Sequence, residues 1–134
     1  MTMNNPIFKI IFVEDDQDLR ESIVQYLEDD GISMTAIGTA HEFISCLDSD
    51  TFDVAIIDVG LPDLSGYVLA EYARLKTDLG IIMLTARGKI EARVQGYLAG
   101  ADLYLVKPVD MNELLAAITN LAKRRTERSR QTDS

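Results

Sequence analysis

Hydrophobic residues in this chain fall into five short runs, separated by longer segments of mixed polarity. Four runs are almost entirely apolar and cover residues 7–13, 54–57, 81–84 and 103–106. Runs of this kind are typical of strands that are buried on both faces of a parallel sheet. The fifth run, residues 32–37, alternates between apolar and polar positions, which is typical of a strand at the edge of a sheet.

The segments between the runs carry apolar residues at the three- and four-residue spacing of amphipathic helices. The first predicted helix covers residues 18–30 and ends at Gly31, a residue favoured just past a helix terminus. The second begins after Thr39, which precedes Glu42 by three residues, the spacing of a capping box. Three further helices are predicted from apolar stripes: Val68, Leu69, Tyr72 and Leu75; Ile90, Val94 and Leu98; and Leu114, Ile118 and Leu121.

Alternation of five strands with five helices predicts an α/β fold of the (βα)5 type, a doubly wound, five-stranded parallel sheet. With the polar strand at the edge, the simplest strand order is 2-1-3-4-5, the flavodoxin-like arrangement. The chain then reverses direction between the first and third strands. Open α/β sheets bind ligands at this switch point, beyond the carboxyl ends of the strands.

Each of the four apolar runs is followed by residues that can carry chemistry. They are Glu14 and Asp15 after the first run, Asp58 after the second, Thr85 after the third and Lys107 after the fourth. Adjacent strands lie about 4.8 Å apart, so the carboxylates of Asp15 and Asp58 repel each other unless they share a proton or bind a cation. We therefore expect a cation site at this edge.

A small set of oxygen ligands with room for water suits Mg²⁺, which often bridges to phosphate. Lys107 adds a fixed positive charge and Thr85 a hydroxyl group, so a phosphoryl group fits between the metal and the lysine. Asp58 is central and is the candidate nucleophile, as carboxylates are in aspartyl-phosphate chemistry. The Lys107–Pro108 bond can be either cis or trans, and a cis bond at this strand end would turn the lysine into the site.

Taken singly, these residues have simpler interpretations. A carboxylate at a strand end is usually a loop residue or a helix cap, and Asp16 or Asp18 is expected to be such a cap. Considered alone, Tyr104 is expected to be a half-buried packing residue. His41 and Cys46 are expected to lie on a surface helix and to have no chemical role. Convergence of four strand ends with complementary chemistry favours a functional site.

Charge is unevenly distributed along the chain. Residues 1–122 hold 8 Lys/Arg against 20 Asp/Glu, a net of −12, whereas residues 123–134 hold 5 against 2, a net of +3. An acidic body is a poor nucleic-acid binder, because phosphate contacts dominate that affinity. No apolar run approaches the roughly 20 residues of a membrane span, and with a single cysteine we expect a cytoplasmic protein.

Four segments together resemble the receiver domain of bacterial two-component response regulators: residues 11–16, 53–66, 81–86 and 100–108. The resemblance covers about residues 7–122 and assigns residues 1–122 to a receiver domain. Residues 123–134 are then a basic polar tail, or a linker to an effector domain outside this chain. The resemblance implies that Asp58 accepts a phosphoryl group from a sensor histidine kinase or a phosphotransfer protein.

The same resemblance implies roles for the other residues at the strand ends. Asp15, Asp58 and the backbone carbonyl of Gly60 would bind Mg²⁺, with Glu14 acting mainly through water. Thr85 and Lys107 would contact the phosphoryl group, and Tyr104 would be an aromatic switch that follows Thr85. The output face, and the surface of an expected homodimer, would be the fourth helix, fifth strand and fifth helix. Regulators with a winged-helix DNA-binding domain often carry an acid where Leu103 stands and an arginine where Ala117 stands, so this dimer mode stays open.

Three other classes share parts of this pattern. A phosphatase of the haloacid-dehalogenase type needs a second Asp two residues after its nucleophile, where this chain has Gly60. A nucleotide-binding domain needs a Gly-rich loop after its first strand, where this chain has Glu14 and Asp15. An interaction module that is not phosphorylated would lack Asp58 or Lys107. We therefore expect a signalling domain that promotes its own phosphotransfer and dephosphorylation, not an enzyme in the ordinary sense.

Overall fold

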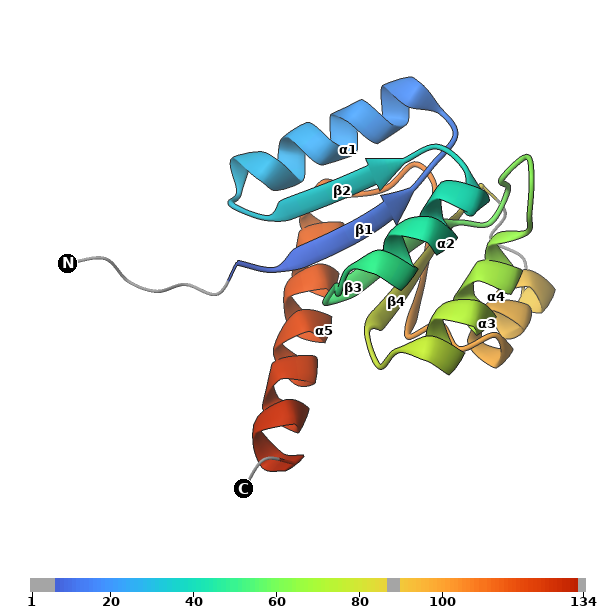
Figure 1. The fold of residues 1–134 in the computed structure, drawn as a ribbon. Coiled ribbons are helices and arrows are strands. Elements are labelled where there is room, and N and C mark those ends of the chain that lie inside the picture. Colours follow the sequence, from blue (N-terminus) through green and yellow to red (C-terminus); the bar gives the residue numbers. More distant parts are fainter. Residues whose placement is uncertain (1–6, 87–89, 133–134) are drawn as a thin grey trace.

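A computed structural model describes residues 7–86 and 90–132. It contains one sheet of five parallel strands in the order β2-β1-β3-β4-β5 (Figure 1). The strands are β1 (Lys9–Val13), β2 (Ser33–Ile37), β3 (Val54–Asp58), β4 (Gly80–Thr85) and β5 (Leu103–Val106). The helices are α1 (Gln17–Asp29), α2 (Ala40–Ser49), α3 (Gly66–Lys76), α4 (Ile90–Leu98) and α5 (Met111–Thr132). The predicted fold class and strand order are confirmed.

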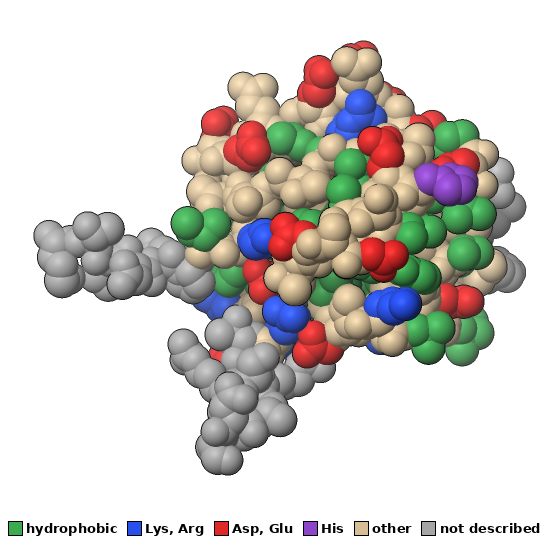
Figure 2. All heavy atoms as spheres, in the orientation of Figure 1, with side chains coloured by type: hydrophobic (Ala, Val, Ile, Leu, Met, Phe, Trp, Pro, Cys, Tyr) green, Lys and Arg blue, Asp and Glu red, His purple; other side chains and the backbone are tan. Residues whose placement is uncertain are grey.

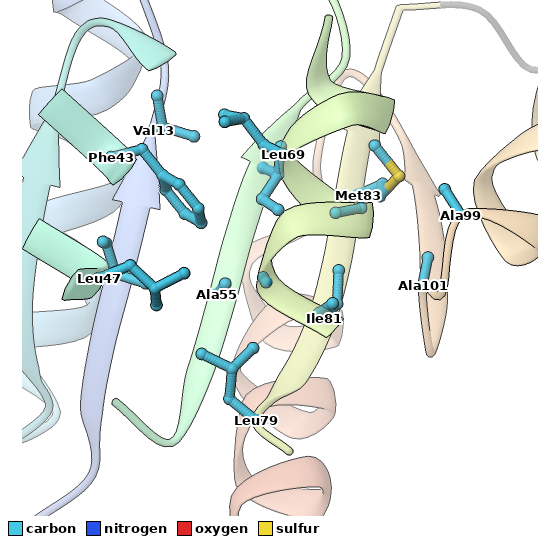
Figure 3. Packing of buried hydrophobic residues seen from close by; sticks show 14 of the residues in the cluster. Val13, Phe43, Leu47, Ala55, Leu69, Leu79, Ile81, Met83, Ala99 and Ala101 are labelled. Atoms are coloured by element: carbon cyan, nitrogen blue, oxygen red, sulfur yellow. The ribbon is translucent and has the colours of Figure 1, made fainter. Parts of the chain in front are cut away.

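Successive residues of the central strands point to opposite faces of the sheet and supply two separate cores. In β1, Ile11 and Val13 join a core beneath α2 and α3, whereas Ile10 and Phe12 join a core beneath α1 and α5. Figure 3 shows the first of these cores, with Phe43 of α2 and Leu69 of α3 packed against the sheet. Burial on both faces explains why these strands are continuous apolar runs.

Polar residues at the helix starts fix where α1, α2 and α3 begin. Asp16 accepts a hydrogen bond from the backbone N–H of Leu19, and Thr39 accepts one from Glu42, so both predicted caps are confirmed. Ser65 caps α3 in the same manner. Gly31 has a φ of +85°, a conformation that favours glycine, and it follows the end of α1 as predicted.

Helix α4 forms where the apolar stripe predicts it, but the stripe lies on its outer side. Ile90 is 72% exposed and Leu98 is 83% exposed. The side of α4 that faces the sheet carries Gly96, because the ring of Tyr104 occupies the space there. The predicted helix is confirmed, and its large apolar side chains are exposed on the surface of α4.

Helix α5 continues to Thr132, past the end of the apolar stripe at Leu121 and Ala122. Arg125 ties the extension to the body of the domain, because its side chain lies 3.2 Å from Asp53 and 3.0 Å from Asp78. The last two residues of the predicted tail, 133–134, lie outside the described residues. Among the helices that the structure describes, none has the length and apolar character that a membrane span needs.

Candidate functional site

The strand register brings the predicted site residues to one edge of the sheet. Asp58 lies opposite Leu84, the residue before Thr85, and Thr85 lies opposite Val106, the residue before Lys107. The backbone N–H of Lys107 donates to the carbonyl of Thr85 at 2.7 Å. The Lys107–Pro108 peptide bond is cis, which is one of the two forms that the sequence allows.

Three carboxylates meet at this edge. Glu14, Asp15 and Asp58 each offer an oxygen, and these oxygens all lie within 4.8 Å of one another. Glu14 and Asp58 are buried, at 1% and 5% exposure, whereas Asp15 is exposed to solvent. A group of hard oxygen donors that is open to water on one side fits Mg²⁺, which keeps several of its waters.

Lys107 is the cation of this cluster. Its Nζ donates to Glu14 Oε1 at 2.8 Å and lies 3.5 Å from Asp58 Oδ1. Burial lowers the pKa of Lys107, but the hydrogen bond to Glu14 and the charge of Asp58 outweigh burial and raise the pKa overall. Lys107 is therefore positively charged, and among the residues that the structure describes it is the cation that pairs with this group of carboxylates.

The pKa of Glu14 is raised, mainly because its carboxyl group is buried. Burial, opposed by the hydrogen bond from Lys107 and reinforced by the charge of Asp58, raises the pKa of Glu14 from 4.5 to about 7. A raised carboxyl pKa means that the protein holds a negative charge there with difficulty. A divalent cation would offset the repulsion that the single lysine leaves.

Backbone packing fixes the position of Asp58. Its Oδ1 accepts a hydrogen bond from the backbone N–H of Gly60 at 3.2 Å. Gly66, the first residue of α3, packs directly against it, because a Cβ on Gly66 would lie 2.4 Å from the carbonyl oxygen of Asp58. Only glycine allows this approach, so the start of α3 rests on the end of β3.

Thr85 is the last residue of β4, and Tyr104 is the second residue of β5, opposite Met83 of β4. Both are buried, at 4% and 8% exposure. The ring of Tyr104 packs against Gly96 of α4, and its hydroxyl lies 3.5 Å from the hydroxyl of Tyr67. Tyr104 is thus more deeply buried than the half-buried packing residue expected from its sequence alone.

Arg20 also contacts the site, and no sequence pattern indicated this contact. Its guanidinium donates to the backbone carbonyl of Glu14 at 2.6 Å and so holds the segment after β1. Arg20 is next to the apolar stripe of α1, and its helical position alone does not show which loop it reaches. Gly38 leaves room for it, since a Cβ there would lie 3.2 Å from Arg20 Nη1.

Asp63 and His41 form a second unpredicted contact, on the loop after β3. The carboxylate of Asp63 accepts hydrogen bonds from the backbone N–H groups of Ala40 and His41, and lies 2.6 Å from His41 Nδ1. The bond from Ala40, with those from His41, holds the pKa of Asp63 well below its ordinary value. His41 is exposed on the surface helix, as expected, and its contact links that helix to the loop.

Comparison with known proteins places this geometry in a family. The family model for the response regulator receiver domain matches residues 10–119. The chain is 36% identical to the transcriptional regulatory protein PmrA of Pectobacterium parmentieri over 87% of its own length and 53% of the relative. It is 39% identical to the transcriptional regulatory protein GltR of Pseudomonas aeruginosa over 86% of its length and 49% of the relative. The chain thus spans about half the length of the curated relatives it matches.

Solved structures agree with this match. The CheY-like receiver domain protein from Methanospirillum hungatei JF-1 superposes with a TM-score of 0.86 at 31% identity, covering 92% of this chain and 99% of that one. The response regulator protein TrrA from Thermotoga maritima, solved in complex with Mg²⁺ and BeF, superposes with a TM-score of 0.78 at 28% identity, covering 86% and 99%. With its parallel sheet and its acidic cluster, this chain belongs to the response regulator receiver domain family and is a signalling domain of a two-component system, not a classical enzyme.

Proposed function

We propose that Asp58 accepts a phosphoryl group from the phosphohistidine of a sensor histidine kinase or a phosphotransfer protein, in a reaction that needs Mg²⁺. The observation that carries this proposal is the cluster of Glu14, Asp15 and Asp58, with oxygens within 4.8 Å and one lysine beside them. The match to the receiver family supports the same assignment.

In this proposal, an oxygen of Asp58 attacks phosphorus, and the bond from phosphorus to the imidazole nitrogen of the donor breaks. Asp15, Asp58 and the carbonyl of Gly60 would hold Mg²⁺, which would supply positive charge to offset the charge of the phosphoryl oxygens. Glu14 acts through water, because its Oε1 already accepts a hydrogen bond from Lys107.

Lys107 bonds a phosphoryl oxygen in the product. Its Nζ lies 3.5 Å from Asp58 Oδ1, so a small movement of the ammonium group brings it to a phosphoryl group on that residue. The same site also supports attack of water on the aspartyl phosphate, so the domain promotes both its own phosphorylation and its own dephosphorylation.

Phosphorylation adds a charge of about −1.5 to −2 at Asp58. Thr85 moves toward this charge, and the ring of Tyr104, which is already buried against Gly96 in this structure, shifts into the space that Thr85 leaves. The change reaches the surface formed by α4, β5 and α5, where large apolar side chains are exposed: Ile90, Val94, Tyr97, Leu98 and Val106. We propose this surface as the output face and as the contact surface of a homodimer.

The acidic domain is proposed to act in the cytoplasm and not to bind nucleic acid itself. Its relatives are about twice its length, and two of them are transcriptional regulatory proteins by name. We therefore propose that residues 123–134 lead from the receiver domain to an effector domain, which would carry any contact with nucleic acid.

Labelling with acetyl phosphate and Mg²⁺, followed by mass spectrometry, tests the proposal. We expect one phosphorylated residue, Asp58, and no label in Asp58→Asn. Asp53→Asn is the matched control, because it removes a carboxylate from the opposite end of the same strand region and should label as the wild type does. A wild-type level of label in Asp58→Asn would contradict the assignment.

A further inference from the structure

Tyr67 stands between the proposed acceptor and the proposed switch residue. It lies in the first turn of α3, where its backbone N–H donates to Ser65 Oγ at 3.1 Å. Its hydroxyl lies 3.5 Å from the hydroxyl of Tyr104, and either group can be the donor. The contact joins two residues that are 37 positions apart in the chain.

Tyr104 is enclosed from two sides. Its ring lies against Gly96, since a Cβ on that residue would come within 2.8 Å of Tyr104 Cδ2 and 3.5 Å of Met83 Sδ. The hydroxyl at the other end of the ring meets Tyr67. In this buried orientation, α4 therefore supports the ring and α3 supports the hydroxyl.

The first turn of α3 is in turn fixed to the end of β3. The backbone N–H of Gly66 donates to the carbonyl of Val59 at 3.1 Å, and the Cα of Gly66 packs against the carbonyl of Asp58. Tyr67 follows Gly66 directly. The residue that contacts the Tyr104 hydroxyl is thus adjacent to the residue that packs on the backbone of Asp58.

We infer that Tyr67 is a positioning residue that holds Tyr104 in its buried orientation and forms a second link, besides Thr85, between Asp58 and Tyr104. This inference rests on the proposed function only in treating Tyr104 as the switch. A hydrogen bond between two neutral groups changes the ratio of buried to rotated Tyr104 about two- to tenfold.

Tyr67→Phe tests the inference, since it removes the hydroxyl and keeps the ring. Tyr72→Phe is the matched control, because Tyr72 lies on the same helix but its hydroxyl bonds Asp48 at 2.5 Å on the surface. With 3-fluorotyrosine incorporated throughout, ¹⁹F NMR of the free protein reports the ratio of buried to rotated Tyr104. We expect this ratio to fall about two- to tenfold in Tyr67→Phe and to stay at the wild-type value in Tyr72→Phe.

A double-mutant cycle with Tyr104→Phe tests whether Tyr67 acts through Tyr104. The readout is the apparent affinity for beryllofluoride, a phosphoryl mimic, in the presence of Mg²⁺. Any loss of affinity caused by Tyr67→Phe should disappear in the Tyr104→Phe background, because the two hydroxyls form one contact.

A wild-type ¹⁹F ratio in Tyr67→Phe would overturn the inference, as would an undiminished effect of Tyr67→Phe in the Tyr104→Phe background. If the proposed function is wrong, these measurements give a different result. In that case the wild type would show no beryllofluoride response that depends on Asp58, while the ¹⁹F ratio of the free protein would still decide the role of Tyr67.

Discussion

The two ends of the sheet hold similar groups of charged residues in opposite arrangements. At the amino-terminal end, carboxylates are matched by nearby cations: Lys9 with Asp50 at 2.8 Å, Arg74 with Asp102 at 2.9 Å, and Arg125 with Asp53 and Asp78 at 3.2 and 3.0 Å. Figure 2 shows red and blue side chains next to each other over the lower part of the visible face. These pairs are partly exposed, so each stabilises the fold modestly.

At the carboxyl end, the carboxylates of Glu14, Asp15 and Asp58 cluster, and among the residues that the structure describes their ion pairs are formed by Lys107 alone. Two of these three carboxylates are buried, so water screens their repulsion poorly. We infer that the ion pairs at the amino-terminal end stabilise the fold, whereas the excess of negative charge at the carboxyl end lowers its stability. In our account that excess is what makes the carboxyl end bind Mg²⁺ and accept phosphate.

The largest effect is expected on the response to a phosphoryl mimic when Lys107, the cation at the carboxyl end, is removed. Lys107→Ala should fold and bind Mg²⁺, because the metal offsets most of the repulsion that the lysine relieves. It should lose most of the response to beryllofluoride near Thr85 and Tyr104, because no ammonium remains to bond the phosphoryl group. NMR spectra of the Mg²⁺ form with and without beryllofluoride measure this loss. A full wild-type shift at Thr85 and Tyr104 would show that Lys107 has no such role.

The two ends should also respond to pH with opposite sign. The pKa of Glu14 is about 7 in the folded protein and 4.5 ordinarily, so between these values the folded state holds a proton that the unfolded state has lost. In EDTA, the free energy of unfolding should therefore fall by roughly 3 kcal/mol as the pH rises from 4.5 to 7. At the amino-terminal end, the hydrogen bond from Lys9 lowers the pKa of Asp50, so its contribution is present above pH 3.8 and is lost as the pH falls below that value.

Denaturant unfolding at several pH values, in the wild type and in Glu14→Gln, separates the two contributions. The amide variant cannot titrate at residue 14, so the decline between pH 4.5 and 7 should be much reduced. If the free energy of unfolding declines equally in Glu14→Gln, a group other than Glu14 causes the decline. The two ends would then not differ in this way in their response to pH.

A smaller effect is expected on the affinity for metal. Asp15→Asn should weaken Mg²⁺ binding at least about tenfold, or about 1.4 kcal/mol, because a directly coordinating negative charge is lost. Asp78→Asn removes an exposed carboxylate at the amino-terminal end and should leave the affinity unchanged. A calorimetric titration compares the three proteins, and equal affinities in the wild type and Asp15→Asn would place the metal elsewhere.

Much of this molecule follows from local patterns in the sequence. The apolar runs at β1, β3, β4 and β5 predict buried parallel strands, and the alternating run at β2 predicts the edge. Because parallel strands end at one edge, the same reasoning predicts that Asp15, Asp58, Thr85 and Lys107 converge. The cis bond before Pro108, in contrast, is allowed by the sequence but not determined by it.

Contacts between distant side chains could not be predicted in this way. Helical periodicity shows which face of a helix carries a residue but not which loop or helix it meets. The bond from Arg20 to the carbonyl of Glu14 and the contact of Tyr67 with Tyr104 are of this kind. The extension of α5 is another, since no apolar residue follows Ala122 and the helix is secured by Arg125, 72 positions from Asp53.

The most direct test of the account is the stability of two variants in the absence of metal. Asp58→Asn and Asp53→Asn each remove one negative charge, the first at the end of β3 and the second just before its start. In each variant the amide oxygen can still accept the hydrogen bond that a backbone N–H donates to the carboxylate. In EDTA, we expect Asp58→Asn to raise the free energy of unfolding, because repulsion from Glu14 and Asp15 is relieved. Asp53→Asn should lower it by about 1 kcal/mol, because Arg125 loses its ion pair. If Asp58→Asn destabilises the protein as Asp53→Asn does, the carboxyl end holds no excess of negative charge and the central claim is wrong.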